Sequence, residues 1–347
     1  MASRVPVFVP GGGACVTVGE WWATLLRVVD DDTAVARLGE FGFIDQVTRR
    51  LSVGAGVELG PGDDAAVITA PDRRVVACVD VLVEGRHFRR DWSAASDVGH
   101  RAAAANLADI AAMGARPTAL LVGLNIPPDL PMSWAEELAD GIDAEAASIG
   151  ASVIGGDTVA APVLSIAVTA LGDLEGRPPV TRSGARPGDV VAMAGRLGWA
   201  AAGVTILSRG FRSPGALVTA HRRPEVPYRC GPAAAILGAT AMIDISDGLL
   251  ADIGHLASAS AVAVDINSAT MDIPPAMRDA GRAMGVDPLH WALTGGDDHA
   301  LVATFPPDLL LGSPWRVIGT VGTGSGVTVD GRGYEGEPGW DHFRQRG

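Results

Sequence analysis

The sequence predicts a mixed α/β protein of the α+β class, built from two domains. Apolar runs rich in β-branched residues, typical of strands, alternate with Ala-rich or amphipathic stretches typical of helices. The chain has 347 residues, of which 48% are hydrophobic, enough to form two cores. The segment 176–189 is rich in Gly, Pro and Arg and indicates a connection between the domains.

The first domain is expected to span residues 39–175. Phe43, Ile44 and Val47 fall at helical spacing, so ordered structure should begin near residue 39 with a helix of about three turns. The patterns that follow predict, in chain order, a strand at 75–83, a helix at 97–113, a strand at 120–126, a helix at 134–149, and strands at 152–154 and 163–171.

The two ends of the chain have different patterns. Residues 1–38 show no clear apolar period, and we expect them to form a mobile extension. The second domain, residues 190–347, should contain a strand that ends at Ile245 and an amphipathic helix from 249 to 256. A late pair of strands is expected around 315–330.

Charge and composition exclude several classes of function. The formal net charge is −13 and the arginines form no basic stripe, so nucleic acid is not expected as a partner. The sequence contains no lysine. The P-loop, the protein-kinase nucleotide site and Schiff-base catalysis all use a lysine, so these are excluded. If the protein handles nucleotide phosphates, metal ions and arginine must supply the positive charge.

The cysteines and the hydropathy pattern bear on the compartment. Cys15, Cys78 and Cys230 are far apart and odd in number, which indicates neither a disulfide framework nor a zinc site. The cytoplasm is therefore the expected location. No uninterrupted apolar stretch of about 18 residues occurs, so we expect no membrane span.

Aspartates recur beside glycine turns and at the ends of apolar runs. Each motif alone has an ordinary explanation, such as a solvated turn, or helix capping by Ser246 or Asp247. Their recurrence in both domains favours a function, because carboxylates beside glycine turns suit Mg²⁺ and phosphate. The motifs are GlyAspAsp at 62–64, Asp80, Asp109, GlyGlyAsp at 155–157, AspIleSerAspGly at 244–248 and GlyGlyAspAsp at 295–298.

Two of these motifs are tied to predicted elements. The GlyGlyAsp turn should place Asp157 at the C-terminal end of a strand, where α/β proteins tend to bind ligands. On the helix at 97–113, Asn106 and Asp109 are three residues apart and share a face. An unpaired buried carboxylate is costly, so a bound cation would be one partner for this pair.

Nine stretches, in this order along the chain, resemble the thiamine-monophosphate kinase family. Single motifs are shared with aminoimidazole ribonucleotide synthetase and selenophosphate synthetase, but the stretches at 80–88 and 339–343 are similar to the thiamine enzymes in particular. The stretches are GlyGluPhe at 39–41, GlyAspAspAlaAla at 62–66, AspValLeuValGluGlyArgHisPhe at 80–88, AsnLeuAlaAspIleAlaAlaMetGlyAlaArgPro at 106–117, GlyGlyAspThr at 155–158, ThrArgSerGlyAlaArgProGlyAsp at 181–189, AspIleSerAspGlyLeu at 244–249, GlyGlyAspAspHisAlaLeu at 295–301 and GlyTrpAspHisPhe at 339–343.

The resemblance implies ATP-dependent phosphorylation of thiamine monophosphate to thiamine diphosphate. It also implies the two-domain aminoimidazole ribonucleotide synthetase-like fold, with the N-terminal domains paired in a homodimer. Asp64, Asp109 and Asp247 would be central to catalysis. By the same resemblance, several Mg²⁺ ions would be held by Asp64, Asp80, Asp109, Asp157, Asp244 and Asp247, ATP would contact Gly156, Asp157, Arg182 and Ser246, and the thiamine substrate would lie near His87, Asp297 and Trp340.

The chemistry of the acceptor predicts the mode of transfer. A phosphate oxygen is already ionised near neutral pH, so the acceptor needs no general base. The main obstacle is the approach of two polyanions, which several Mg²⁺ ions would relieve. We therefore expect direct in-line transfer without a phosphoenzyme.

The sequence departs from the family pattern at two sites. Cys78 and Val79 stand where Ser and Thr are common, and Asp297 replaces a longer glutamate within GlyGlyAspAspHisAla. Three alternatives stay open: an ATP-using enzyme of the same superfamily with another small substrate, an inactive metal-binding relative, and a two-carboxylate hydrolase. The first is not a selenophosphate synthetase, because no catalytic cysteine with an adjacent lysine lies near the N-terminus.

Overall fold

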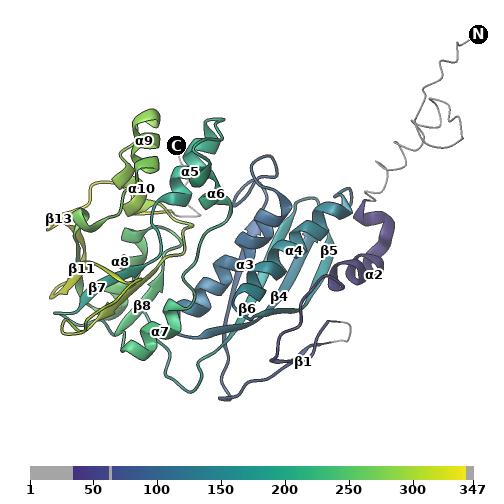
Figure 1. The fold of residues 1–347 in the computed structure, drawn as a ribbon, viewed down its shortest axis with the longest axis horizontal. Helices are drawn as coiled ribbons and strands as arrows, with labels where there is room; N and C mark the ends of the chain where they lie inside the picture. The colour runs from purple at the N-terminus through teal and green to yellow at the C-terminus, as the bar shows by residue number, and fades with distance from the viewer. Residues whose placement is uncertain (1–33, 62–64, 341–347) are drawn as a thin grey trace, which may run out of the picture.

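A computed structural model of the chain describes residues 34–61 and 65–340 (Figure 1). The first half forms a four-stranded sheet in the order β3-β6-β4-β5, in which only β4 and β5 are parallel. Helices α3 and α4 pack on one face of this sheet (Figure 1). The elements are α2 (Val35–Thr48), β1 (Val57–Leu59), β2 (Val67–Ile68), β3 (Val76–Val83), α3 (Ala95–Ala112), β4 (Arg116–Ile126), α4 (Met132–Ser148), β5 (Ser152–Ala160) and β6 (Ser165–Asp173).

The opposite face of the four-stranded sheet is open to solvent. Successive residues of a strand point to opposite faces, and on β3 every second side chain is exposed. Val79 is 59% exposed and Val81 49% exposed, and Val159 on β5 is exposed as well. This half of the molecule therefore presents apolar surface where a partner could pack.

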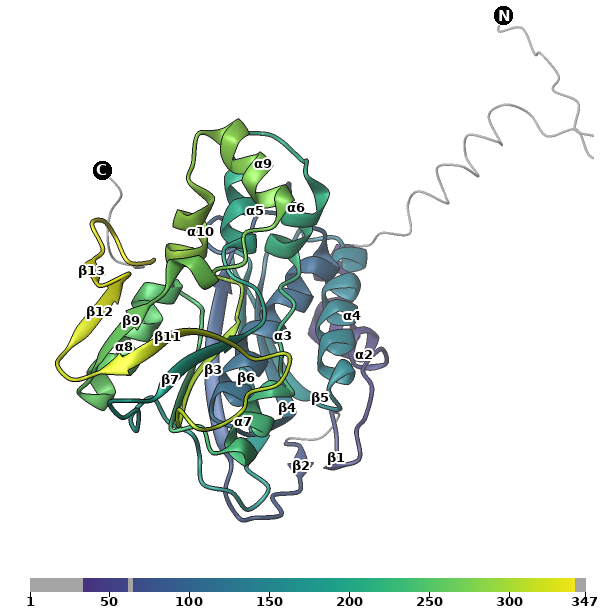
Figure 2. The ribbon, with the colours of Figure 1, turned by 60° about the vertical axis from the view of Figure 1, so that its left-hand side comes forward.

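The second half is built around a seven-stranded sheet in the order β13-β12-β9-β11-β7-β10-β8. Its strands β8 and β10 are buried along their whole length. Helices α5, α6, α9 and α10 form a separate group beyond the sheet (Figure 2). The elements are β7 (Val190–Ala194), α5 (Trp199–Ser208), α6 (Gly215–Arg222), α7 (Cys230–Leu237), β8 (Ala241–Asp244), α8 (Leu249–Ser260), β9 (Ala263–Ile266), the 3₁₀ helix η1 (Ser268–Thr270), α9 (Pro275–Met284), α10 (Pro288–Thr294), β10 (Leu301–Phe305), β11 (Arg316–Gly322), β12 (Gly326–Val329) and β13 (Arg332–Gly333).

Helix α3 joins the two halves through a shared core. Its residue Ile110 belongs to the same buried cluster as Ala234 of α7 and Phe305 of β10. Gly231 of α7 lies directly against α3, since a Cβ there would sit 1.9 Å from the carbonyl oxygen of Ala111. Only glycine allows this contact of two helix backbones, so α7 packs on α3 without intervening side chains at that point.

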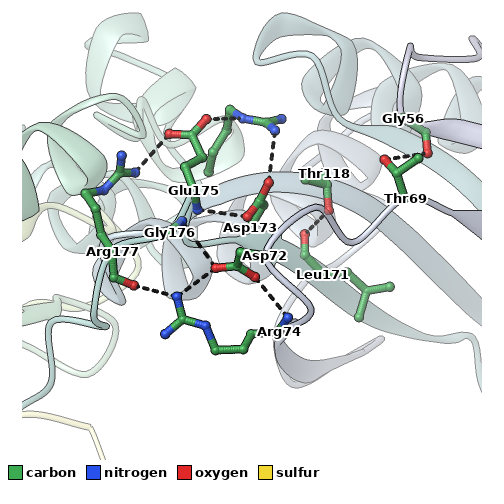
Figure 3. A network of polar contacts seen from close by, with 11 residues as sticks. Gly56, Thr69, Asp72, Arg74, Thr118, Leu171, Asp173, Glu175, Gly176 and Arg177 are labelled. Atoms are coloured by element: carbon green, nitrogen blue, oxygen red, sulfur yellow. Dashed lines mark hydrogen bonds and ion pairs between the residues drawn. The ribbon is translucent and has the colours of Figure 1, made fainter.

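A polar network anchors the start of the connection between the halves (Figure 3). Arg74 Nη2 donates to Asp72 Oδ2 at 2.8 Å and to the carbonyl of Arg177 at 3.0 Å. Asp72 Oδ2 also accepts from the Gly176 amide at 3.3 Å, and Arg177 Nη2 donates to Glu175 Oε2 at 2.9 Å. The network thus fixes residues 175–177 to the loop before β3.

The elements with clear periodicity were predicted correctly. The strand predicted at 75–83 is β3, the helix at 97–113 is α3, and the helix at 249–256 lies within α8. The first helix begins earlier than residue 39, because Val35 N donates to the Leu130 carbonyl and fixes the helix start. Residues 1–33, the rest of the expected extension, lie outside the described residues.

One prediction about a strand was wrong. β5 does not end before GlyGlyAsp but continues through it to Ala160, so Asp157 lies inside a strand and pairs with Gly123 of β4. A Cβ at Gly156 would sit 2.0 Å from the Val122 carbonyl oxygen, so this glycine permits close strand pairing and is not part of a turn. The two late strands predicted around 315–330 are present as β11 and β12, and β9 lies between them in the sheet.

The recurrence of glycine–aspartate turns after strands is also weaker than expected. The turn at 295–298 follows helix α10 instead of a strand, and residues 62–64 lie outside the described residues. Of the motifs in the described chain, the one at 244–248 does lie between a strand and a helix. None of the helices in the described ranges is long and apolar enough to cross a bilayer.

Candidate active site

Three segments of the second half meet at the loop that follows β8. Asp297 N donates to the Ser246 carbonyl at 2.9 Å, and Trp340 N donates to the Asp247 carbonyl at 2.9 Å. His299 N donates to the carbonyl of Ile245 at 3.0 Å. The loop 244–248, the turn 295–299 and the C-terminal segment at 340 therefore bring together five of the predicted site residues: Asp244, Ser246, Asp247, Asp297 and Trp340.

Asp252 holds this loop in shape. Its Oδ2 accepts hydrogen bonds from the amides of Ser246, Asp247 and Gly248, at 3.0 to 3.1 Å. The N-cap position of helix α8 is taken by Gly248, so neither Ser246 nor Asp247 occupies it. Burial, and then the charges of Asp244 and Asp247, raise the pKa of Asp252 to about 7.

Sequence reasoning missed Asp252. A carboxylate in the first turn of the predicted helix at 249–256 was a signal for it, because such groups accept the free amides of a helix start. The three amides that could have faced a phosphate at this loop are instead turned toward Asp252. A ligand at this loop would therefore meet side chains more than main-chain amides.

Asp244 lies beside a buried histidine. His299 Nδ1 is 3.1 Å from Asp244 Oδ2, and both side chains are almost fully buried. Burial works against a charged ring, but the hydrogen bond and the charge of Asp244 raise the pKa of His299 above its usual range. His299 is thus a hydrogen-bonding partner of Asp244, a role that the sequence did not indicate.

The first half contributes Asp80 on β3 and a polar pair on α3. Asn106 Oδ1 accepts from Asp80 N at 2.9 Å, and its Nδ2 donates to the Ala102 carbonyl at 3.0 Å. The hydrogen-bonding partners of Asn106 are therefore the main chain of a strand and of its own helix. Cys78 Sγ donates to the Asn106 carbonyl at 3.3 Å, and burial raises the pKa of this thiol far above its usual value.

Asp109 faces carboxylates from both halves. Burial raises its pKa to about 7, and the charges of Asp244 and Asp80 add to the effect. A divalent cation bound by carboxylate oxygens would relieve this repulsion, so the donor set fits Mg²⁺. Within the described ranges, however, no three acidic, histidine or cysteine side chains already converge on one point, and Asp64 lies outside those ranges.

A buried arginine also crosses between the halves. Arg101 of α3 forms an ion pair with Asp297, with Nη2 at 2.7 Å from Oδ2. Burial alone would raise the pKa of Asp297, but Arg101 and neighbouring histidines hold it below its usual range. The next residue, Asp298, is buried and accepts from the Ala200 amide at 3.0 Å. Arg101 was not among the predicted site residues.

The remaining predicted residues lie elsewhere. Gly156 and Asp157 are in β5, the strand at one edge of the four-stranded sheet. The main chain of Arg182 is held by Ser260 at the far end of α8, about 18 Å along the helix from the 244–248 loop. His87 lies in the turn after β3, where its Nδ1 accepts from Val83 N at 3.0 Å.

Comparison with known proteins gives a consistent set of relatives. Residues 62–174 match the family described as AIR synthase related protein, N-terminal domain. The thiamine-monophosphate kinase of Mycobacterium tuberculosis (strain H37Rv) is 47% identical over 315 residues, covering 90% of this chain and 94% of that protein. The enzyme of the same name from Escherichia coli (strain K12) is 35% identical, covering 88% of this chain and 98% of that protein.

Solved structures agree with these relatives. The thiamine-monophosphate kinase of Stenotrophomonas maltophilia K279a has a TM-score of 0.75 and 33% identity, and covers 85% of this chain and 97% of its own. AaThiL complexed with AMPPCP and TMP has a TM-score of 0.74 and 33% identity, and covers 90% of this chain and all of its own. The hydrogenase maturation protein HypE of E. coli, at 18% identity and a TM-score of 0.67, shares the fold alone. The α+β architecture, the order of the acidic motifs and these similarities show that the chain belongs to the thiamine-monophosphate kinase family.

Proposed function

We propose that the protein phosphorylates thiamine monophosphate to thiamine diphosphate with ATP. The observation that carries the proposal is that α3 packs against β8, so that Asp109 lies near enough to Asp244 for the two charges to repel each other. Family membership supports it, because a relative of 33% identity is complexed with AMPPCP, an ATP analogue, and TMP. The proposed compartment is the cytoplasm, and the two described cysteines, Cys78 and Cys230, are free thiols.

Mg²⁺ ions, when bound, would neutralise the phosphates and polarise the transferring group. The proposed ligands are Asp64, Asp80, Asp109, Asp157, Asp244 and Asp247. Asp252 and His299 would keep the 244–248 loop and Asp244 in place for this task. ATP would lie near Gly156, Asp157, Arg182 and Ser246, and thiamine monophosphate near His87, Asp297 and Trp340.

Transfer is proposed to be direct and in line. The acceptor phosphate is ionised at neutral pH, so none of these side chains needs to remove a proton from it. The chain's own groups bind and orient the two substrates instead. A kinetically competent covalent phosphoenzyme, detected by mass spectrometry after quenching, would rule out this mode.

We further propose that the first halves of two chains pair through their open sheet faces. Support comes from the exposed apolar side chains of β3 and β5, which would be buried in such a dimer. Analytical ultracentrifugation is expected to find a dimer that Val81→Asp converts to monomer. A wild-type monomer at micromolar concentration would contradict this arrangement.

The kinase proposal is tested by quantifying thiamine diphosphate after incubation with ATP, Mg²⁺ and thiamine monophosphate. Product should appear with the wild type and be lost both in EDTA and in Asp247→Asn. If the wild type binds Mg²⁺ and ATP but makes no product, another substrate within the superfamily is favoured. If it binds neither, the chain is an inactive relative.

A further inference from the structure

Arg101 and Asp297 form a contact between the halves that is buried at one end and open at the other. The Arg101 side chain is 9% exposed, whereas that of Asp297 is 48% exposed. Arg101 Nη2 lies 2.7 Å from Asp297 Oδ2, and about half of the Asp297 side chain stays exposed beside this contact. A buried arginine needs such a partner, because an unpaired buried charge is strongly destabilising.

The backbone fixes Asp297 from the other side. Its φ is 67°, a left-handed value that is uncommon for a residue with a side chain, and its amide donates to the Ser246 carbonyl. The neighbouring His221 ring is buried, and burial and the charge of Arg101 lower its pKa to about 3, so it stays neutral. Arg101 is therefore the cation in direct contact with the carboxylate of Asp297, and the charge of His299 acts on it from farther away.

We propose that Arg101 is a positioning residue for the acceptor substrate, which holds Asp297 so that its open face contacts thiamine monophosphate. This inference rests on the proposed function, which places that substrate beside Asp297. A carboxylate complements the cationic thiazolium ring and the amino group of the pyrimidine of thiamine. Asp297 is one methylene shorter than the glutamate expected from the family pattern, so its reach depends more on the group that holds it.

The test measures KM for each substrate with purified full-length protein. Arg101→Gln should raise KM for thiamine monophosphate about tenfold, the value expected for loss of one charge-assisted hydrogen bond. KM for ATP and kcat should change less than about twofold. Arg101→Lys should restore much of the affinity, because a single N–O contact does not require the guanidinium fork.

A double-mutant cycle ties the effect to Asp297. If Arg101 acts through Asp297, Arg101→Gln combined with Asp297→Asn should be no worse than Asp297→Asn alone. Additive losses would overturn the inference. If Arg101→Gln does not fold, KM for thiamine monophosphate is measured in Arg101→Lys and Asp297→Asn instead. An unchanged KM in both variants would overturn the inference.

Arg223 provides the matched control. It also links the second half to α3, by an ion pair with Asp97 near the helix start, but outside the acidic site. Arg223→Gln should leave KM for thiamine monophosphate unchanged, and an increase equal to that of Arg101→Gln would overturn the inference. A wild type that makes no thiamine diphosphate would remove the proposed function and this inference with it. An active wild type with unchanged KM in Arg101→Gln would remove the inference alone.

Discussion

The two sides of the acidic site are held in place in different ways. On the side of the second half, Asp244 has His299 and Asp252 has three amides, all from the same half, and Asp297 has Arg101 from α3 of the first half. On the side of the first half, Asp109 faces other carboxylates and its pKa is raised. The comparison teaches that each of these aspartates of the second half has a charged or hydrogen-bonding partner, whereas Asp109 keeps a repulsion that a bound cation would relieve.

The largest effect is expected when the carboxylate Asp109 of the first half, or the metal that it would bind, is removed. Removing metal with EDTA, or making Asp109→Asn, should lower kcat for thiamine diphosphate formation by about 10³-fold, because a bound cation supplies several kcal/mol to the transition state. The matched control is Asp129→Asn, which changes an exposed aspartate and should retain activity. Full activity in EDTA would contradict the comparison.

The next largest effect concerns the side of the second half. Asp252→Ala should lower the free energy of unfolding by about 3 kcal/mol, because three amides lose their acceptor. Asp252→Asn should lose less, since its carbonyl oxygen can still accept. In the same urea titrations without metal, Asp109→Ala should not be destabilising. If Asp109→Ala cost as much as Asp252→Ala, the two sides would not differ in the way described.

Asp298 gives a pH test within the second half. Burial raises its pKa to about 7, and within the described chain its buried Oδ2 has no hydrogen-bond partner. A carboxyl with a raised native pKa is protonated in the native state below that value but ionised in the unfolded state above about pH 4. Its contribution to stability therefore falls as pH rises through this window.

The measurement is the urea midpoint of the wild type and of Asp298→Asn between pH 5 and 8. Relative to the variant, the wild type should lose about 2 kcal/mol over this range. Neighbouring carboxyls titrate in both proteins, so the difference isolates Asp298. If the urea midpoints of the two proteins changed with pH in parallel, ionisation of Asp298 would not destabilise the fold. The second half would then tolerate this buried charge.

The smallest effect is expected for Cys78, which lies on β3 of the first half. Cys78→Ser should change kcat/KM less than about twofold, because a serine hydroxyl can donate to the same Asn106 carbonyl. The half-buried Cys78 thiol of the folded wild type should resist iodoacetamide at pH 8, since its pKa is raised. A large gain in Mg²⁺ affinity in Cys78→Ser would indicate that this position is a metal ligand.

Local patterns predicted the elements whose neighbours in sequence decide their shape. β3, α3 and α8 follow apolar periodicity, whereas Asp244, Asp247 and Asp297 were named as site residues only through the family resemblance. The strand predicted at 152–154 was too short, because GlyGlyAsp is typical of a turn. In the structure, parallel pairing with β4 keeps β5 extended through these residues. That pairing involves residues distant in sequence.

The missed site residues have the same explanation. Arg101 occurs in an Ala-rich helix, where an arginine is an ordinary solvated residue, and its partner Asp297 is far along the chain. His299 and Asp252 are recognised only once the loop at 244–248 is in place. Side chains whose roles depend on a fold-dependent partner could not be found from spacing alone.

The glycine contact between α7 and α3 limits how the family's halves can be recombined. Because Gly231 lies on the carbonyl of Ala111, a chimaera that takes its second half from a relative with a bulkier residue there would force the halves apart. The same displacement would separate Asp109 from Asp244, which meet across that seam. A chimaera of two relatives should therefore take the contact surfaces of α3 and α7 from the same parent protein.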